Sequence, residues 1–324
     1  MTLFVYEHIT ATMPASDTSL YREGRAMREA LIADLDAIEG IEVVPFRAGD
    51  SFDECVRKCD AVWLVAPEFG DSLGRLADGV VECGKTLLGP SPSAIRLTAN
   101  KFELFKHWQR TGVPTPMTVP CHEWPSVAFP FVVKPIDGCG STATTFVNRA
   151  EGMPAALNRA AEVGYEPDRL IVQPFSPGRP ASVAFLIGKT SATPLVPTFQ
   201  YVVAESHFAY DSGELPIPHD LAVRAIQLGQ RAVNCVPGLF GYVGVDLILG
   251  DESDGSHDVA IEINPRLTTS YVGLRELAEF NIAEAAYDLC LRNVIPIPKW
   301  KPIRMRFTPE GVVRRLEHFQ FHSR

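Results

Sequence analysis

Short apolar runs alternate with amphipathic stretches over the first ninety residues, and this alternation limits the fold more than any other feature of the sequence. The apolar runs cover residues 3–6, 41–45, 61–65 and 86–88, and the amphipathic stretches cover residues 20–38 and 72–83. A strand buried on both faces is apolar throughout, whereas a helix that covers it is apolar along one stripe only. The pattern therefore predicts β-α-β units, which build a parallel sheet with helices on its faces.

A turn-rich segment, Gly-Pro-Ser-Pro-Ser at residues 89–93, marks the first boundary. After it the sequence predicts helices at 100–111 and 150–163, strands at 129–134 and 169–174, and a glycine-rich loop at 137–142. We therefore expect an α/β domain at residues 1–95 and a central lobe at residues 96–172.

The remaining residues, 173–324, have a different character and are expected to form a C-terminal lobe. Strands are predicted at 181–187, 195–203, 242–249 and 259–263, the first two pairing antiparallel, and helices at 220–236 and 272–291. Residues 204–218 are predicted to be a long loop that closes as a lid. The tail from residue 304 is basic and indicates no structure.

Charge and cysteine content restrict the partners and the compartment. The 324 residues contain 30 Lys and Arg against 39 Asp and Glu, a net charge of −9. Such a chain lacks the field that holds nucleic acid or an acidic membrane surface, so small molecules are the expected partners. The seven cysteines are odd in number and form no C-x-x-C pair, which favours free thiols in the cytoplasm. No apolar run approaches the roughly 18 residues of a membrane span.

Two familiar motifs occur in settings that do not suit them. Residues 79–86 match the phosphate-binding pattern G-x-x-x-x-G-K-[ST], but the predicted order is helix then strand, the reverse of what that loop needs. Residues 70–74, Gly-Asp-Ser-Leu-Gly, match a hydrolase signature with Ser72 as nucleophile, and Asp254 and His257 would complete a triad. A serine hydrolase is therefore the rival enzyme class.

Lys134 ends an otherwise apolar strand and is followed by a loop that contains Gly138, Gly140 and Ser141. Glycines let the backbone approach a phosphate and donate its amides, and the lysine supplies a positive charge. The alternative is an ordinary turn beside a surface lysine. We favour phosphate binding, because a lysine at the end of a buried strand needs a partner.

Three oxygen-bearing side chains fall on two neighbouring strands. Asp246 interrupts an apolar strand, and Glu262 and Asn264 lie two residues apart on the same face of the next one. Oxygen ligands suit Mg²⁺ or Mn²⁺, and buried carboxylates are costly unless they are paired or bind metal. Arg266 follows, placed to bind an anion. The alternative is a cluster of salt bridges at the strand ends.

A third segment, residues 170–176, is an apolar strand that enters a turn with Gln173 and Phe175, where a purine could take backbone hydrogen bonds against apolar walls.

Taken together, the chain resembles the ATP-grasp superfamily of carboxylate-amine ligases, from Asn100 and Lys101 through Thr115 and Pro116 to the segment 262–266. The resemblance implies an ATP-grasp fold with an N-terminal parallel α/β domain. It also implies roles for the site residues: Lys101, Lys134 and the loop residues Gly138, Gly140 and Ser141 on the ATP phosphates, Gln173 and Phe175 on adenine, Asp246, Glu262 and Asn264 on two Mg²⁺ ions, and Arg266 on the transferred phosphoryl group. One departure is Pro180, at a position where many relatives carry an acid for the ribose.

Within the superfamily, residues 4–7, 23–27 and 263–274 are similar to the tyramine-glutamate ligase group of methanofuran-type cofactor biosynthesis. The resemblance implies that a small-molecule carboxylate attacks ATP and that an amine displaces the phosphate from the acyl phosphate formed. A ligase of other amino acids or peptides is the alternative, and a homodimer is one expected assembly. Arg22, Arg25, Glu7, Tyr271 and Ser270 are candidates for the acceptor pocket, although each is equally well explained as a surface or packing residue.

Overall fold

The computed structural model describes residues 1–13, 18–138, 140, 142–204 and 208–316. Its first sheet is parallel, with strand order β2-β1-β3-β4. The strands are β1 (Thr2–Glu7), β2 (Glu42–Pro45), β3 (Ala61–Val65) and β4 (Thr86–Leu87), and the helices are α1 (His8–Thr12), α2 (Ser19–Asp36), α3 (Phe52–Lys58) and α4 (Ser72–Glu82). The predicted β-α-β region is confirmed.

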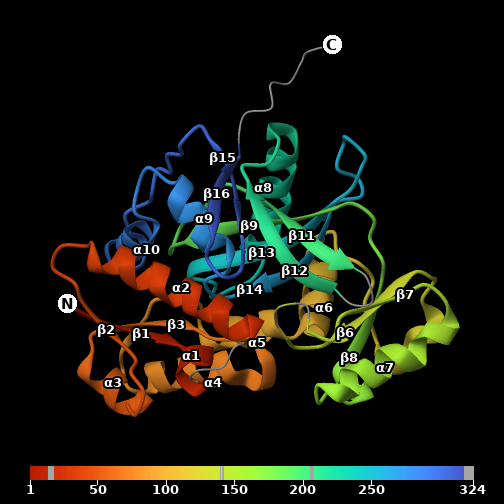
Figure 1. Ribbon diagram of the computed structural model, residues 1–324, viewed down its shortest axis with the longest axis horizontal. Helices are drawn as coiled ribbons and strands as arrows, with labels where there is room; N and C mark the ends of the chain where they lie inside the picture. The colour runs from red at the N-terminus through yellow and green to blue at the C-terminus, as the bar shows by residue number, and fades with distance from the viewer. Residues whose placement is uncertain (14–17, 139, 141, 205–207, 317–324) are drawn as a thin grey trace.

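Alternate residues of β1 explain the two helical layers on this sheet. Leu3 and Val5 belong to one buried cluster with Leu31 of α2, whereas Phe4 and Tyr6 belong to another that includes residues of α3 and α4. Figure 1 shows α2 on one side of the strands and α3 and α4 on the other. A strand that buries both faces needs the continuous apolar run observed in the sequence.

A second sheet, antiparallel and four-stranded, follows helices α5 (Pro92–Ala99) and α6 (Lys101–Thr111). Its strand order is β5-β8-β6-β7, with β5 (Val119–Pro120), β6 (Phe131–Pro135), β7 (Thr145–Val147) and β8 (Leu170–Pro174). Helix α7 (Met153–Glu162) packs Ala156 and Ala160 into the core of this sheet. Short 3₁₀ helices lie at Phe69–Asp71, Cys121–Ser126, Ala150–Gly152 and Pro167–Arg169.

The largest sheet contains eight strands in the order β14-β13-β9-β11-β12-β15-β16, with β10 paired to β9. The strands are β9 (Arg179–Ile187), β10 (Ala192–Pro194), β11 (Thr198–Ala204), β12 (Phe208–Leu215), β13 (Gly241–Leu249), β14 (Val259–Asn264), β15 (Arg304–Phe307) and β16 (Val313–Leu316). Helices α8 (His219–Asn234), α9 (Ser270–Leu277) and α10 (Ile282–Arg292) accompany it. Every described helix is too short or too polar to cross a membrane.

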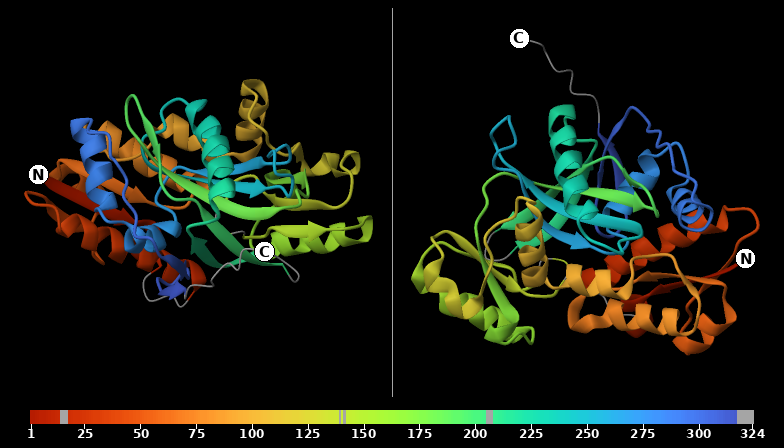
Figure 2. Two further views of the ribbon diagram at one scale, coloured as in Figure 1. Left: turned by 90° about the horizontal axis from the view of Figure 1, so that it is seen from above. Right: turned by 180° about the vertical axis from the view of Figure 1, so that it is seen from behind.

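The first and the largest sheets share a core. Leu31 and Leu35 of α2 belong to the same buried cluster as Leu274 of α9 and Ala286 of α10. Both views in Figure 2 place α10 beside the N-terminal region, although the two are far apart in the sequence. The N-terminal region is therefore packed against the large sheet and not tethered by a linker.

The predicted loop at 204–218 is wrong, because residues 208–215 form β12, which pairs antiparallel with β11 and with β15. Polar residues such as Ser212 and Glu214 hid the strand in the sequence. Both are buried in the structure, where Glu214 contacts Arg304 and Arg306 from β15. The tail that seemed to indicate no structure supplies β15 and β16. The part of the predicted lid at residues 205–207 lies outside the described residues.

The single helix predicted at 272–291 is wrong as well, because the structure has two. Helix α9 ends at Leu277, Ala278 pairs with Trp300 in an isolated bridge, and Asn281 caps α10 by accepting a hydrogen bond from the backbone of Glu284. Helix α5 was not predicted; it begins at Pro92, within the turn-rich segment 89–93, with Ser91 as its N-cap.

Candidate active site

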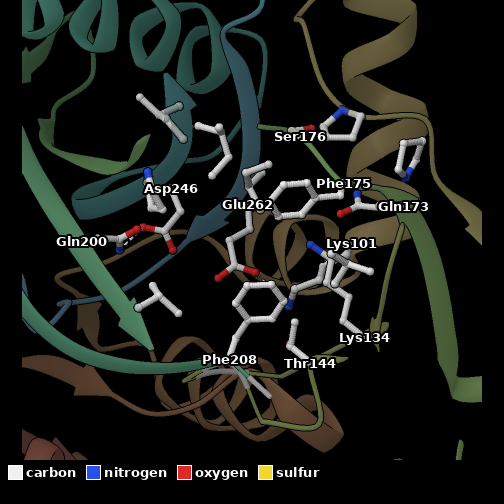
Figure 3. Close-up of a pocket in the computed structure, with 18 of the residues that line it drawn as sticks. Lys101, Lys134, Thr144, Gln173, Phe175, Ser176, Gln200, Phe208, Asp246 and Glu262 are labelled. Carbon is white, nitrogen blue, oxygen red and sulfur yellow. Dashed lines mark hydrogen bonds and ion pairs between the residues drawn. The ribbon is translucent and has the colours of Figure 1, made fainter. Parts of the chain in front are cut away.

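The antiparallel four-stranded sheet (β5-β8-β6-β7) and the eight-stranded sheet enclose a cavity of about 280 Å³ between them. Strands β6 and β8 form one wall, and β9, β11, β13 and β14 form the other. Figure 3 shows Lys101, Lys134 and Gln173 on one side of this space and Asp246 and Glu262 on the other. The structure therefore brings together residues from each of the three segments that the sequence singled out.

Asp246 and Glu262 are direct partners in the antiparallel register of β13 and β14, so their side chains lie on the same face. The Asp246 carboxylate accepts a hydrogen bond from Asn264 Nδ2 at 3.0 Å and another from Gln200 Nε2 at 2.9 Å. Burial and the neighbouring Glu262 raise the pKa of Asp246 to about 7. Although burial opposes ionisation of Glu262 too, Lys101 and Lys134 hold its pKa below the usual value.

This arrangement fits a divalent cation. Two adjacent buried carboxylates repel each other unless a positive charge lies between them, and hard oxygen donors are what Mg²⁺ and Mn²⁺ prefer. The amide of Asn264 donates through its nitrogen to Asp246, which leaves its carbonyl oxygen as a neutral donor. The oxygen donors of these residues are therefore of the kind that Mg²⁺ or Mn²⁺ would need.

Two lysines supply positive charge at the same point. Lys101 Nζ lies 3.0 Å from Glu262 Oε2 and donates to the carbonyl of Gly138 at 3.0 Å. Lys134 is 6% exposed, and burial lowers its pKa to about 8. Helix α6 begins at Lys101 with Asn100 as its N-cap, and β6 ends one residue after Lys134, so rigid elements hold both ammonium groups.

The described residues of the glycine-rich loop contact both Lys101 and the N-terminal region. Gly138 and Gly140 have φ values of +154° and +63°, in the region that favours glycine. Ser141, which the sequence analysis assigned to phosphate binding, lies outside the described residues. The loop is anchored by Asp137. Its carboxylate accepts a hydrogen bond from the backbone of Gly70 at 3.0 Å and forms an ion pair with Arg169 at 2.9 Å.

Gln173 and Phe175 also line the cavity, together with apolar residues such as Val132, Leu247 and Ile248. Gln173 is buried and donates through Nε2 to the Thr118 hydroxyl at 2.7 Å. Phe175 packs edge-on against Phe146, with ring centroids 5.1 Å apart. Pro180 also lines the cavity.

Arg266 is fixed by a residue that the sequence analysis missed. Its guanidinium contacts the buried carboxylate of Glu68 at 2.9 and 3.1 Å and donates to the carbonyl of Leu267 at 3.1 Å. Glu68 lies three residues beyond the carboxyl end of β3. An acid at that edge of a parallel sheet is the signal that could have indicated it, because ligand sites form at the carboxyl ends of such strands.

A second cavity, of about 480 Å³, adjoins the first. It shares Asp246 and Glu262 with the first cavity and adds Arg266, Glu23 and Tyr210. Among the acceptor-pocket candidates, Ser270 lines it. The others have structural contacts: Tyr271 donates to Asp34, Arg25 pairs with Glu29, Arg22 lies near Glu310, and Glu7 caps α1.

The rival motifs have structural roles. Ser72 begins α4 and donates to the carbonyl of Phe69 at 3.0 Å, whereas His257 lies between β13 and β14, against Gly250. Gly70 serves as the amide donor to Asp137. Residues 79–86 run from α4 into β4, in the order opposite to a phosphate-binding loop. A serine hydrolase is therefore not favoured.

Comparison with known proteins identifies the class. The chain belongs to the ATP-grasp family: residues 98–270 match the model of the ATP-grasp domain, and residues 26–95 match that of the pre ATP-grasp 3 domain. The fold predicted from the sequence is thereby confirmed. Members of this family use ATP and divalent metal ions.

Two relatives of similar sequence share one name. Two curated proteins named tyramine–L-glutamate ligase are similar to this chain. The one from Methanocaldococcus jannaschii is 32% identical over 70% of this chain and 63% of its own length, and the one from Methanocaldococcus fervens is 30% identical over 70% and 67%. The match to the first thus spans less than two thirds of that relative.

Solved structures agree on the fold. An ATP-grasp superfamily protein from Archaeoglobus fulgidus superposes with a TM-score of 0.73 at 25% identity, covering 95% of this chain and 92% of that one. A D-alanine–D-alanine ligase from Bacillus anthracis gives 0.65 at 16% identity, covering 90% and 99%.

Proposed function

We propose that this protein is an ATP-dependent carboxylate-amine ligase that joins glutamate to tyramine or a similar amine. One observation carries the proposal: the cavity with the lysines and the glycine loop meets a second, polar cavity at Asp246, Glu262 and Arg266. Such a junction brings a nucleotide phosphate in one cavity beside a carboxylate in the other. The names of the two relatives support glutamate and tyramine as substrates. Another amino acid or a peptide is the alternative acid.

The proposed roles follow the geometry. Lys101, Lys134 and the backbone of the glycine loop, with Gly138, Gly140 and Ser141, bind the phosphates of ATP, while the segment with Gln173 and Phe175 binds adenine. Asp246, Glu262 and Asn264 hold Mg²⁺ or Mn²⁺, as two ions. When bound, the metal neutralises charge on the phosphates and aligns them for in-line transfer.

The reaction needs no covalent enzyme nucleophile. The substrate carboxylate attacks the γ-phosphorus of ATP, and the bond to the bridging oxygen breaks to release ADP. The amine then attacks the carbonyl carbon of the acyl phosphate, inorganic phosphate leaves, and the amine loses a proton. Lys134 and Arg266 stabilise the charge on the transferred phosphoryl group, and the surrounding lobes exclude water.

We also propose a domain division, a cellular location and an oligomeric state. We assign residues 1–95 to an N-terminal domain, 96–172 to a central lobe and 173–324 to a C-terminal lobe, the last two holding ATP between them. The six described cysteines are free thiols, which supports the expected cytoplasmic location. A homodimer remains a prediction that sedimentation can test.

An ADP-release assay tests the activity. With MgATP we expect ADP only when glutamate and tyramine are both present, together with a product whose mass is their sum less one water. Omission of Mg²⁺ is expected to abolish release. ADP release without amide product, or none with any pair from a panel of amino acids and amines, would refute the ligase proposal.

Glu262→Gln tests the metal assignment. The change keeps the shape of the side chain but removes a charge that a divalent ion requires, so we expect turnover to fall by at least about 100-fold with the fold retained. Circular dichroism checks the fold, and Asp258→Asn, outside the two cavities, is the control for turnover. Wild-type turnover in Glu262→Gln would contradict the assignment.

A further inference from the structure

The second cavity contains one acidic side chain that the proposed chemistry does not use. Glu23 lies in the second turn of α2 and lines this cavity, together with Thr269, Ser270 and Arg266. It also lines a smaller, mostly apolar recess that continues toward the first sheet. Its carboxylate accepts a hydrogen bond from the Thr269 hydroxyl. Glu23 therefore belongs to the wall of the second cavity and comes from a different domain than the metal ligands.

The charges around Glu23 are predominantly negative. Glu7 and Glu310 are the acidic groups that act on it, and Arg266 is the cation that does so. Arg266 is already paired with the buried Glu68 carboxylate, and Glu310 lies 3.9 Å from Arg22. A carboxylate in this setting, removed from bulk water, is stabilised by a cation that enters the cavity.

A hydrogen-bonding cation fits this position better than a bare metal ion. The Thr269 hydroxyl contacts the single carboxylate of Glu23, and the hydroxyls of Thr268 and Ser270, which bond to each other, line the same cavity. An ammonium group has three donors and would bond to the carboxylate and to hydroxyl oxygens at once. We propose that Glu23 binds the ammonium group of the acid substrate, so that the enzyme selects an amino acid over a simple carboxylic acid. This inference rests on the proposed ligase function.

The ammonium concerned is one that does not react. The amine that attacks the acyl phosphate must lose a proton to free its lone pair, and an adjacent carboxylate would keep it protonated. Glu23 therefore suits the spectator ammonium of the acid. The reacting carboxylate of the same molecule would lie toward Arg266 and the metal ligands.

One cavity contains both groups. Glu23 and Asp246 both line it, together with Tyr210. Tyr210 lines the cavity from β12. The proposed ammonium position and the reacting centre therefore lie in one cavity of about 480 Å³.

The test compares glutamate with glutarate, which has both carboxylates but lacks the ammonium group, in wild type and in Glu23→Gln. In wild type we expect kcat/KM for glutamate to exceed that for glutarate by about 100-fold, because a site built for a polar group rejects its absence. In Glu23→Gln we expect kcat/KM to fall by roughly 30-fold with glutamate and by less than about 3-fold with glutarate. The KM for ATP should stay the same.

Two further variants sharpen the test. Glu310→Gln removes a nearby negative charge from a side chain that does not line the cavity. It should change kcat/KM for glutamate and for glutarate by no more than about 2-fold. Thr269→Val keeps the Glu23 charge but removes its hydrogen-bond donor, and should reduce glutamate turnover less than Glu23→Gln does.

The outcomes separate this inference from the proposed function. An equal loss with both acids in Glu23→Gln, or an effect on the KM for tyramine alone, overturns the ammonium site and leaves the ligase intact. If the wild-type protein turns over glutarate but not glutamate, the ammonium site is also overturned and the ligase function stands. Wild-type ADP release with neither acid overturns the proposed substrates, and the ammonium site with them.

Discussion

Arg266 illustrates how much a single side chain depends on a distant one. Its sequence position, two residues beyond Asn264, places it near the proposed metal ligands, but its guanidinium is oriented by Glu68, which follows β3, at 2.9 and 3.1 Å. The pair is almost fully buried, with side-chain exposures of 10% and 4%. An arginine held in two places loses little entropy when it binds an anion, which is what a group that stabilises a transferred phosphoryl requires.

Glu68→Gln should therefore impair turnover more than binding. The amide retains hydrogen bonding but not the charge that holds Arg266, so we expect kcat for ADP release to fall by roughly 10- to 100-fold, while the KM for ATP changes by less than about 2-fold. Steady-state kinetics measures both. Glu310→Gln serves as the control for loss of one acid in the same region. A raised KM for ATP with normal kcat would contradict a positioning role for Glu68.

At the scale of the element, the glycine loop is held at its first residue. Asp137 follows β6, accepts a hydrogen bond from the backbone of Gly70 and forms an ion pair with Arg169, so the loop leaves the sheet in a set direction. The sequence analysis identified the loop and its glycines, because glycine spacing after an apolar strand is a local signal. It could not identify the anchor, because Gly70 is 67 residues away and acts through its backbone.

Asp137→Ala tests whether the anchor matters for the nucleotide. Without the carboxylate the loop loses two contacts, so more of the binding energy is spent on ordering it, and we expect the KM for ATP to rise about 10-fold with a smaller change in kcat. Arg169→Ala is the matched control, because its side chain is half exposed and its loss leaves the Gly70 contact in place. An unchanged KM for ATP in Asp137→Ala would show that the loop orders independently of the first domain.

The same distinction between local and distant signals explains the errors in predicting the elements. Strands with long apolar runs, such as β1, β3 and β13, and capped helices such as α6 were predicted close to their observed bounds. Strand β12 was missed, because the polar Glu214 is buried by partners from β15 that lie about 90 residues later. The break between α9 and α10 was missed because it depends on Trp300 pairing with Ala278. The helical periodicity of the sequence continues from α9 into α10, so it gives no sign of the break.

At the scale of the whole molecule, α2 ties the N-terminal domain to the large sheet. Asp34, near its C-terminal end, accepts hydrogen bonds from Tyr271 Oη at 2.5 Å and from Arg275 Nη2 at 2.7 Å, both on α9. Asn281, the cap of α10, donates to the carbonyl of Asp34 at 2.6 Å. Near its other end α2 carries Glu23, which contacts Thr269. The helix that shapes the second cavity is therefore the one that joins the domains.

Asp34→Ala should weaken this joint measurably. It leaves the buried Tyr271 hydroxyl and the partly buried Arg275 without their carboxylate partner, for which we expect a loss of about 2–4 kcal/mol in the free energy of unfolding. Urea denaturation, followed by circular dichroism and tryptophan fluorescence, measures the loss. Asp288→Ala is the control, because its i,i+4 pair with the exposed Arg292 on α10 is worth well under 1 kcal/mol.

The same variant tests whether the joint transmits to the active site. If α2 positions Glu23 through its packing on α9, then Asp34→Ala should raise the KM for glutamate as well as reduce stability. The KM for ATP should stay unchanged, because the residues that line the first cavity, the proposed ATP site, belong to other elements. Loss of stability with normal kinetics for both substrates would mean that Thr269 and the shared core hold Glu23 without help from Asp34.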